Sequence, residues 1–428
     1  MAALCLPLAP DARMRFAAAP GTLVIGLMVA APAWAEANPW WVGADAQVQT
    51  DSNVFRLEAD DALPAGRSRS DRRLLTTIRG GLDQPIGRQR VYADAALTDA
   101  RHSRNDELNH RAHRVRAGLD WSTVGRLSGD VTLGTERGLA TYGVDDSTEA
   151  RFERNLRTQQ HAGAKVRLGV VTRWTAQAEI DTHRVRYSQD SANRLEFNQR
   201  SVFLGMIYSP TGLSRWGLGL RQGQTDYPNY QAQADGSVLA DRAKTRHVEL
   251  RMQLAPGGVS ELNARVGIGR TRYDLAQSRD VDGVTGEASW TWRPTGKLTI
   301  DTRLQRDRGE EFNLKDATLA SQTVDYSRTS NGLSALAVYA LSAKIGLTAR
   351  AATIHRNLAD TRADATGTPT TREGRDRTQL LSLGARWNPT RAAEFSCEAA
   401  RESRHASGEI TSDFSVNSFT CRAALMLR

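Results

Sequence analysis

Apolar and polar residues alternate with a period of two along most of the chain. In the stretch 288–306, Trp290 and Trp292 alternate with small polar residues, a Pro294-Thr295-Gly296 turn follows, and a second alternating run passes through Leu304. A period of two indicates a β-strand with one apolar and one polar face. The pattern recurs at 42–48, 91–97, 115–121, 127–133, 162–168, 174–180, 202–208, 216–220, 248–254, 262–268, 345–351 and 381–387. It predicts an all-β protein.

The connections between these strands are alternately short and long. Short turns such as 122–125 and 293–296 are rich in turn-forming residues, and polar segments of roughly 8 to 22 residues separate them. Eight short turns and nine long segments predict 18 strands. The long segments lie near 58–71, 102–109, 138–152, 187–198, 224–244, 273–282, 307–329, 355–376 and 402–414. Short turns at one end and long loops at the other are typical of a transmembrane antiparallel up-and-down β-barrel.

Aromatic residues gather next to the short turns. They either end a strand before such a turn or begin one after it. A soluble sandwich or propeller would pack its apolar faces together and would need no such bias. We therefore expect an aromatic girdle at the periplasmic interface of a closed barrel with an aqueous lumen. Its members are Trp121, Trp174, Tyr208, Trp216, Trp292 and Trp387.

Composition and the N-terminal segment fit an exported protein. The chain has 428 residues and a mean hydropathy of −0.49, and its N-terminal segment has the three parts of a secretory signal peptide. Arg13 and Arg15 form the basic part, 16–32 the apolar core and Ala33-Trp34-Ala35 the cleavage site. A membrane anchor is disfavoured because this core is shorter than a spanning helix. We expect residues 1–35 to be a cleaved signal, starting at Met1 or Met14, and 36–428 to form a barrel in the outer membrane of a Gram-negative bacterium.

Strand parity places many arginines on the polar face, which faces the lumen. They can grip carboxylate or phosphate groups of an acidic polysaccharide, or form cross-strand ion pairs with acidic residues on the same face, which stiffen the wall. Both interpretations remain open. The predicted lumen arginines are Arg79, Arg116, Arg167, Arg221, Arg251, Arg265, Arg303, Arg350 and Arg386.

Cys397 and Cys421 lie symmetrically about residue 409 in the last predicted hairpin. A symmetric hairpin would bring them together on the outward face, and export places them in an oxidising compartment, so a disulfide is expected. Two free buried thiols are the alternative, because cross-strand geometry lies near the limit of what the bond accepts.

The sequence predicts no catalytic residues, no cofactor and no metal. His102, His110 and His113 cluster near a long loop, but no cysteine or acidic residue has ligand spacing to them. The glycine-rich segment 217–223 lies inside a strand, which indicates close packing or a wide lumen and not a phosphate-binding loop. Serine elbows and zinc-protease motifs are absent. The basic segment 67–73 suggests a surface loop near anionic lipopolysaccharide, not a nucleic-acid site.

Two stretches resemble a family of outer-membrane barrels. "QTDSNVFRL" (49–57) resembles its Ser-Asn-Val-Phe-Arg element, and "IYSPTGLSRWGLGLRQGQTDYPNY" (207–230) is similar to its Ser-Pro-x-Gly turn, aromatic strand and Tyr-Pro-Asn-Tyr loop. The two C-terminal cysteines also fit. The family is the EpsL-type, exosortase-associated group, close to β-barrel porins. The resemblance implies export of an extracellular polysaccharide across the outer membrane.

The leading hypothesis is therefore a passive conduit for an exopolysaccharide, and the alternative is a general diffusion porin for small solutes. A loop folded into the lumen would favour the porin. The expected partners are outer-membrane lipid and lipopolysaccharide, the polysaccharide itself, the barrel-insertion machinery, and periplasmic and inner-membrane export components. An enzyme of the barrel rim is disfavoured. The lipid face of the strand at 333–340 stays undecided, because both of its faces are apolar.

Overall fold

The computed structural model describes residues 38–140, 152–169, 172–232, 236–307, 327–363, 369–408 and 410–428. In these residues, eighteen antiparallel strands form one sheet in which each strand pairs with the next along the chain. The first strand, β1 (Trp40–Asp51), pairs with both β2 (Asp71–Ile86) and β18 (Phe414–Leu427). Because the last strand joins the first, the sheet is a closed barrel without free edges. The predicted fold is confirmed, and the predicted signal peptide lies outside the described residues.

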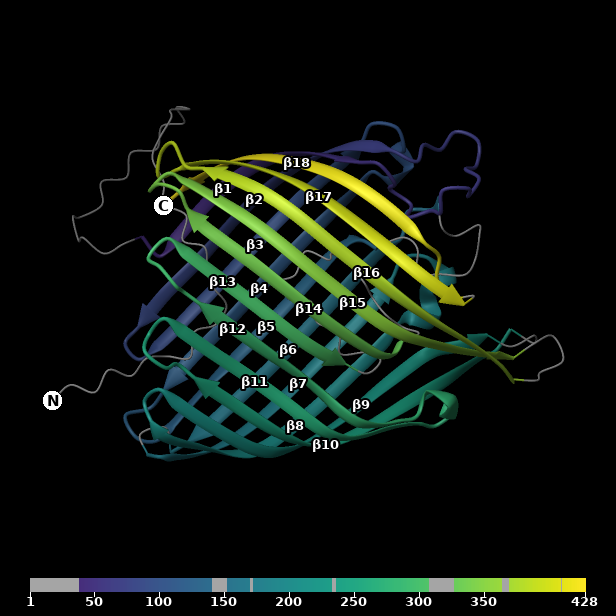
Figure 1. The fold of residues 1–428 in the computed structure, drawn as a ribbon. Coiled ribbons are helices and arrows are strands. Elements are labelled where there is room, and N and C mark those ends of the chain that lie inside the picture. Colours follow the sequence, from purple (N-terminus) through teal and green to yellow (C-terminus); the bar gives the residue numbers. More distant parts are fainter. Residues whose placement is uncertain are drawn as a thin grey trace.

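The strands are long enough to cross a bilayer at a tilt (Figure 1). A strand rises about 3.3 Å per residue, so the length of a fourteen-residue strand is greater than the thickness of the hydrocarbon core. The remaining strands are β3 (Gln89–His102), β4 (His110–Ser122), β5 (Leu127–Leu139), β6 (Leu156–Leu168), β7 (Trp174–Tyr187), β8 (Phe197–Thr211), β9 (Ser214–Ala232), β10 (Val238–Leu254), β11 (Ser260–Tyr273), β12 (Val281–Trp292), β13 (Leu298–Asp307), β14 (Ser327–Ala340), β15 (Ile345–Ala363), β16 (Pro369–Trp387) and β17 (Ala393–Gly408).

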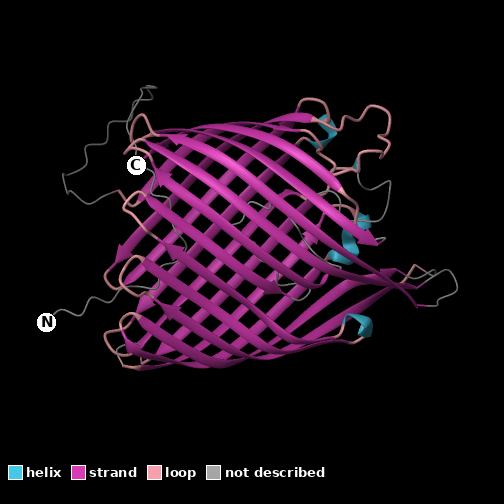
Figure 2. Cartoon of the chain, viewed as in Figure 1, coloured by secondary structure: helices cyan, strands magenta, loops and turns pink. Residues whose placement is uncertain are grey.

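The two ends of the barrel differ in their connections. Short turns and the C-terminus lie at one end, and long loops lie at the other (Figure 2). Three short 3-10 helices, η1 (Asp106–Leu108), η3 (Asp190–Leu195) and η4 (Gln277–Arg279), lie in the long connections. No helix in the described part of the chain is long and apolar enough to span a membrane.

Most strands have an apolar outer face and a polar inner face. Leu204, Leu220 and Leu383 are 60%, 66% and 69% exposed, which would be unfavourable in water and is favourable in hydrocarbon. Side chains on the concave face converge and bury one another, as Glu249 does on β10. The outer surface is therefore lipid-facing, and the protein is an outer-membrane barrel.

Three of the predicted long loops are wrong in large part. The segment 224–244 continues β9 and β10 as a hairpin, 355–376 largely continues β15 and β16, and 402–408 belongs to β17. The alternation of apolar and polar residues stops where the strands leave the lipid, but the backbone hydrogen bonds continue. The sequence signal for a strand therefore ended earlier than the strand itself.

The register of β14 settles which of its faces meets the lipid. Leu333 pairs with the outward-facing Leu304 on β13, and both side chains are exposed. Tyr339 shares that face, so Leu336 and Val338 point into the barrel. Pattern alone could not decide this, because both faces of β14 carry aliphatic residues.

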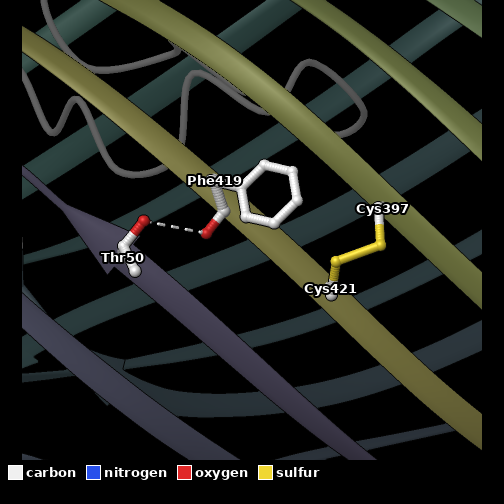
Figure 3. Close-up of a disulfide and its surroundings, with 4 residues drawn as sticks. All are labelled: Thr50, Cys397, Phe419 and Cys421. Atoms are coloured by element: carbon white, nitrogen blue, oxygen red, sulfur yellow. Dashed lines mark hydrogen bonds between the residues drawn. A yellow bond between two sulfur atoms is a disulfide. The ribbon is translucent and has the colours of Figure 1, made fainter.

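A disulfide joins the last two strands on the outer face (Figure 3). Cys397 on β17 lies directly opposite Cys421 on β18, with the two Cα atoms 4.1 Å apart. The expected pairing is confirmed. On the other side of β18, the Thr50 hydroxyl of β1 donates a hydrogen bond of 3.4 Å to the carbonyl oxygen of Phe419 (Figure 3). The covalent link therefore lies one strand away from the seam between β18 and β1.

Candidate functional site: the channel interior

All nine predicted lumen arginines have the parity of the inner face. The outward residues beside them alternate as expected; Leu220 and Leu250, for example, are exposed next to Arg221 and Arg251. What differs among the arginines is their partners. The structure gives ion pairs to Arg79, Arg167, Arg221, Arg251 and Arg303.

The centre of the wall is an ion-pair network on β7, β9 and β10. Arg251 donates two hydrogen bonds of 2.7 Å to the two carboxylate oxygens of Glu179, three strands away. Arg221 lies between them and donates at 2.9 Å to both Glu179 and Glu249. The Nε of Arg251 also reaches Glu249 at 2.6 Å. Two arginines and two glutamates thus satisfy one another, and the group, defined here as the central network, has balanced charge.

The network continues toward β5 and β6 with looser spacing. Lys165 on β6 lies 3.6 Å from Glu179 and 3.8 Å from Asp130, and Arg167 donates to Asp130 at 2.8 Å. A chain of alternating charges therefore spans six adjacent strands, β5 to β10. This arrangement supports the ion-pair interpretation for this sector of the wall.

Phe203 on β8 forms the apolar base of the central network. The guanidinium carbon of Arg251 lies 3.8 Å from the centre of its ring, and that of Arg221 lies 5.3 Å away. A cation above an aromatic face is stabilised by the ring quadrupole. A Cβ at Gly205 or Gly219 would lie 2.5 Å from this ring, so both glycines make room for it. The predicted close packing at 217–223 is confirmed at Gly219.

A second charged group lies at the seam of the barrel. Asp45 on β1 pairs with Arg79 on β2 and with Arg422 on β18, the latter at 3.1 Å. Arg422 also lies 3.6 Å from Glu394 on β17. Two arginines therefore share one buried aspartate here. Asp45 and Arg422 were missed in the sequence, although their parity was available to find them.

Three predicted lumen arginines have no ion pair among the described residues: Arg116 on β4, Arg265 on β11 and Arg350 on β15. Arg116 is exposed inside the barrel. Each lies five or six residues from the short-turn end of its strand. They are the arginines best placed to meet a solute, and that role stays a prediction.

The long-loop mouth of the barrel is crossed by a chain segment. Ala192 and Leu195 of η3, in the loop between β7 and β8, pack in one buried apolar cluster with Leu358 on β15 and Ile410 of the β17–β18 loop. β15 lies seven strands from β8, close to the opposite side of an 18-stranded ring. The loop therefore reaches across the lumen. The local sequence pattern did not indicate this contact.

The Ser-Asn-Val-Phe-Arg element forms a compact turn between β1 and β2. The Asn53 side chain donates to the carbonyl oxygen of Leu57 and accepts from its amide. Phe55 is buried against Phe152, with ring centres 5.1 Å apart. Arg56 adopts a φ of 57° and pairs with Asp51 at 3.0 Å. These residues tie the loop to the barrel rim.

The predicted aromatic girdle residues occur at the short-turn end. Trp174, Trp216, Trp292 and Trp387 are exposed on the outer face, and Trp121 and Tyr208 are partly buried. Trp174 and Tyr208 pack with ring centres 4.6 Å apart. Aromatic rings at this level suit the headgroup region of a bilayer.

The three clustered histidines do not converge. His102 and His110 have inner-face parity with ring centres 6.1 Å apart, and His113 has outer-face parity. Among the described residues, no group of three or more His, Cys, Asp or Glu is arranged to hold a metal ion.

Comparison with known proteins gives likeness to solved barrels alone. No family model and no curated protein matches the chain. The outer membrane protein OpdK of Pseudomonas aeruginosa is 14% identical, with a TM-score of 0.48 over 91% of this chain and 99% of that one. OccK2 (OpdF) of the same organism is 13% identical, with a TM-score of 0.48 over 91% and 98%. The architecture of this chain is established by its own closed strand ladder.

Proposed function

We propose that the protein is a passive outer-membrane channel for small polar solutes. Two features support this function. The inner wall is polar and charged, which keeps the lumen hydrated. The η3 loop spans the mouth to contact Leu358 and Ile410. It therefore makes the passage narrower than the lumen of an 18-stranded barrel without a crossing loop. The crossing loop is the observation that carries the proposal, because it favours small solutes over a long polymer.

The channel should discriminate only weakly between anions and cations. In the central network two arginines face two glutamates, and Asp130 balances Arg167. A wall with compensated charges attracts neither anions nor cations strongly. Arg116, Arg265 and Arg350 have no ion pair among the described residues and add a mild bias toward anions.

Conductance in planar bilayers tests the proposal. We expect the refolded protein to conduct ions, to pass small sugars and to be unaffected by long polysaccharide fragments. Replacing Asp190–Leu195 by a Gly-Ser segment of equal length should raise conductance and admit larger solutes. The matched control replaces Asp106–Leu108 of η1 in the same way, because η1 packs on the rim with Phe55 and does not cross. Equal conductance in all three proteins would contradict the proposal.

Export of an extracellular polysaccharide is the second candidate, and the resemblance of 49–57 and 207–230 to the EpsL-type family favours it. In the structure, residues of both segments pack at the rim and outer end of the wall, where Phe55 and Tyr227 are buried. Buried residues at these positions stabilise the barrel, so the resemblance supports a fold shared with the EpsL-type family more directly than a shared transported substance. Block of the open channel by long acidic polysaccharide, with no passage of small sugars, would favour export over diffusion.

A further inference from the structure

The connections at the two ends of the barrel differ in their acidic residues. At the long-loop end both signs of charge occur, with acidic residues such as Asp106, Asp190 and Asp413. The eight short connections at the other end (Figure 2) contain seven basic residues and no aspartate or glutamate. This set, named here the short-turn rim, therefore carries charge of one sign only. It consists of 87–88, 123–126, 169–173, 212–213, 255–259, 293–297, 341–344 and 388–392.

The basic residues of the short-turn rim are exposed and come from six of its eight connections. In the described part of the chain none of them forms an ion pair, and Arg88 donates a hydrogen bond of 3.1 Å to the carbonyl oxygen of Thr123. Charge of one sign around an opening sums to a field that attracts anionic groups. The seven residues are Arg88, Arg126, Arg173, Arg293, Lys297, Lys344 and Arg391.

Aliphatic side chains in the same connections are also exposed. Val124 is 86% exposed, Leu213 56%, Val259 52% and Leu341 49%. Val124 follows Trp121 of the aromatic girdle by three residues, in the direction that leads away from the membrane. Because the girdle marks the interface between lipid and water, this tip lies on the aqueous side of it. Contact with the hydrocarbon core therefore does not account for its exposed apolar surface.

Exposed cations together with exposed aliphatic tips fit the surface of a protein better than a small anion or a lipid headgroup. A small anion would need the cations alone. A phospholipid would place nothing apolar beyond the girdle, where Val124 lies. Protein interfaces combine apolar contacts with polar ones, and arginine, which supplies five of the seven cations here, is enriched in them. Carboxylates on such a partner would match the charge of the rim.

We propose that the short-turn rim is the docking surface for an acidic protein of the periplasm. Its carboxylates face the rim cations, and its apolar side chains cover tips such as Val124 and Leu213. The connections that carry the cations surround the lumen, so the docked protein lies over the short-turn opening. Complementary charge of this kind accelerates association and fixes the orientation of the partner. This inference is independent of what passes through the lumen.

Site-specific photo-cross-linking of the full-length chain, in the outer membrane of the cells that encode it, tests the proposal. The photoreactive amino acid p-benzoylphenylalanine, placed at Val124 or at Leu213, should give a discrete adduct with a protein of acidic isoelectric point. The same amino acid placed at Leu275, which is 50% exposed at the long-loop end, should not give this adduct. No protein adduct from either rim position, or an adduct with phospholipid alone, would overturn the proposal.

The adduct must also depend on the charge of the rim. Each exposed ion pair contributes roughly a two- to threefold change in affinity, so Arg126→Gln/Lys344→Gln/Arg391→Gln should lower the yield from Leu213 about tenfold. The control Arg72→Gln/Arg137→Gln/Arg401→Gln removes three exposed arginines near the long-loop end and should leave the yield unchanged.

Salt supplies the same readout without these substitutions. Raising the salt concentration of the medium screens exposed charges and should lower the yield from Leu213 in the otherwise unchanged chain. Conductance of the rim variant in 1 M salt should equal that of the wild type, which separates lost docking from lost folding. Equal yields from the rim variant and the control, or a yield that does not respond to salt, would overturn the proposal.

Discussion

Arg251 on β10 makes a bidentate salt bridge to Glu179 on β7, with both N–O distances at 2.7 Å. The contact passes over β8 and β9, so it braces three neighbouring strand pairs at once. Glu179 and Glu249 are buried, and buried carboxylates that lose their charge or partner are costly.

Neutralising Glu179 should destabilise the barrel. We expect Glu179→Gln to lower the free energy of unfolding by about 3 kcal/mol, because Arg221 and Arg251 would lose the carboxylate that joins them and keep only Glu249 and the longer contact of Arg221 with Asp181. The same change should shift the reversal potential toward anions in a salt gradient. Glu136→Gln is the control, since its pair with Arg114 is about half exposed and should contribute less than about 1 kcal/mol. Equal losses in both variants would contradict a special role for the central network.

Gly219 should tolerate no side chain. A Cβ there would lie 2.5 Å from both the carbonyl oxygen of Leu204 and the ring of Phe203. We expect Gly219→Ala to cost about 2 kcal/mol, because overpacking forces backbone and ring to move. Gly223→Ala on the same strand face is the control, since the nearest atom is 3.5 Å away. Urea unfolding, followed by tryptophan fluorescence, measures the stability of both variants. An unchanged midpoint for Gly219→Ala would show that the barrel wall accommodates the methyl group and would contradict the prediction.

Reduction of the disulfide should weaken the barrel without opening it. The bond links residues 24 positions apart, and a loop of that size corresponds to about 3 kcal/mol in the chain-entropy account. The backbone ladder between β17 and β18 remains when the sulfurs separate. We expect a lower unfolding midpoint in reductant and unchanged conductance. The Cys397→Ala/Cys421→Ala variant should show the lower midpoint with and without reductant; a reductant effect in that variant would point to another cause.

Asp45 should control charge selectivity at the seam. It is the shared partner of Arg79 and Arg422, so Asp45→Asn leaves two inward arginines with one nearby carboxylate, Glu394. We expect a clear shift of the reversal potential toward anions. Asp99→Asn is a control on the outer surface, where Asp99 pairs with the exposed Arg101, and it should leave selectivity unchanged. A shift of the reversal potential in the control and none in Asp45→Asn would show that the charged residues at the seam do not determine charge selectivity.

Period-two alternation was sufficient to predict most strands and the orientation of the arginines, because lipid on one side and water on the other impose opposite demands on neighbouring residues. The number of strands came from the alternation of short and long connections. The partners of each arginine could not be predicted, since they depend on the register between strands. Arg251 meets Glu179 only because β7 to β10 are aligned as they are. The η3 crossing was also hidden: Leu195 and Leu358 are 163 positions apart, and no local pattern relates them.

The covalent bond between β17 and β18 also determines where the wall can part. When two neighbouring strands of a barrel separate, the lumen opens sideways to the bilayer. The eighteen junctions between neighbouring strands are not equivalent in this barrel. Cys397 and Cys421 close one of them permanently under oxidising conditions. The adjoining seam between β18 and β1 is held by backbone hydrogen bonds, the Asp45–Arg422 pair and the Thr50 hydroxyl. Strands β17 and β18 therefore enter or leave the wall as a single unit, and a lateral opening beside them forms at the β18–β1 seam or at the β16–β17 seam.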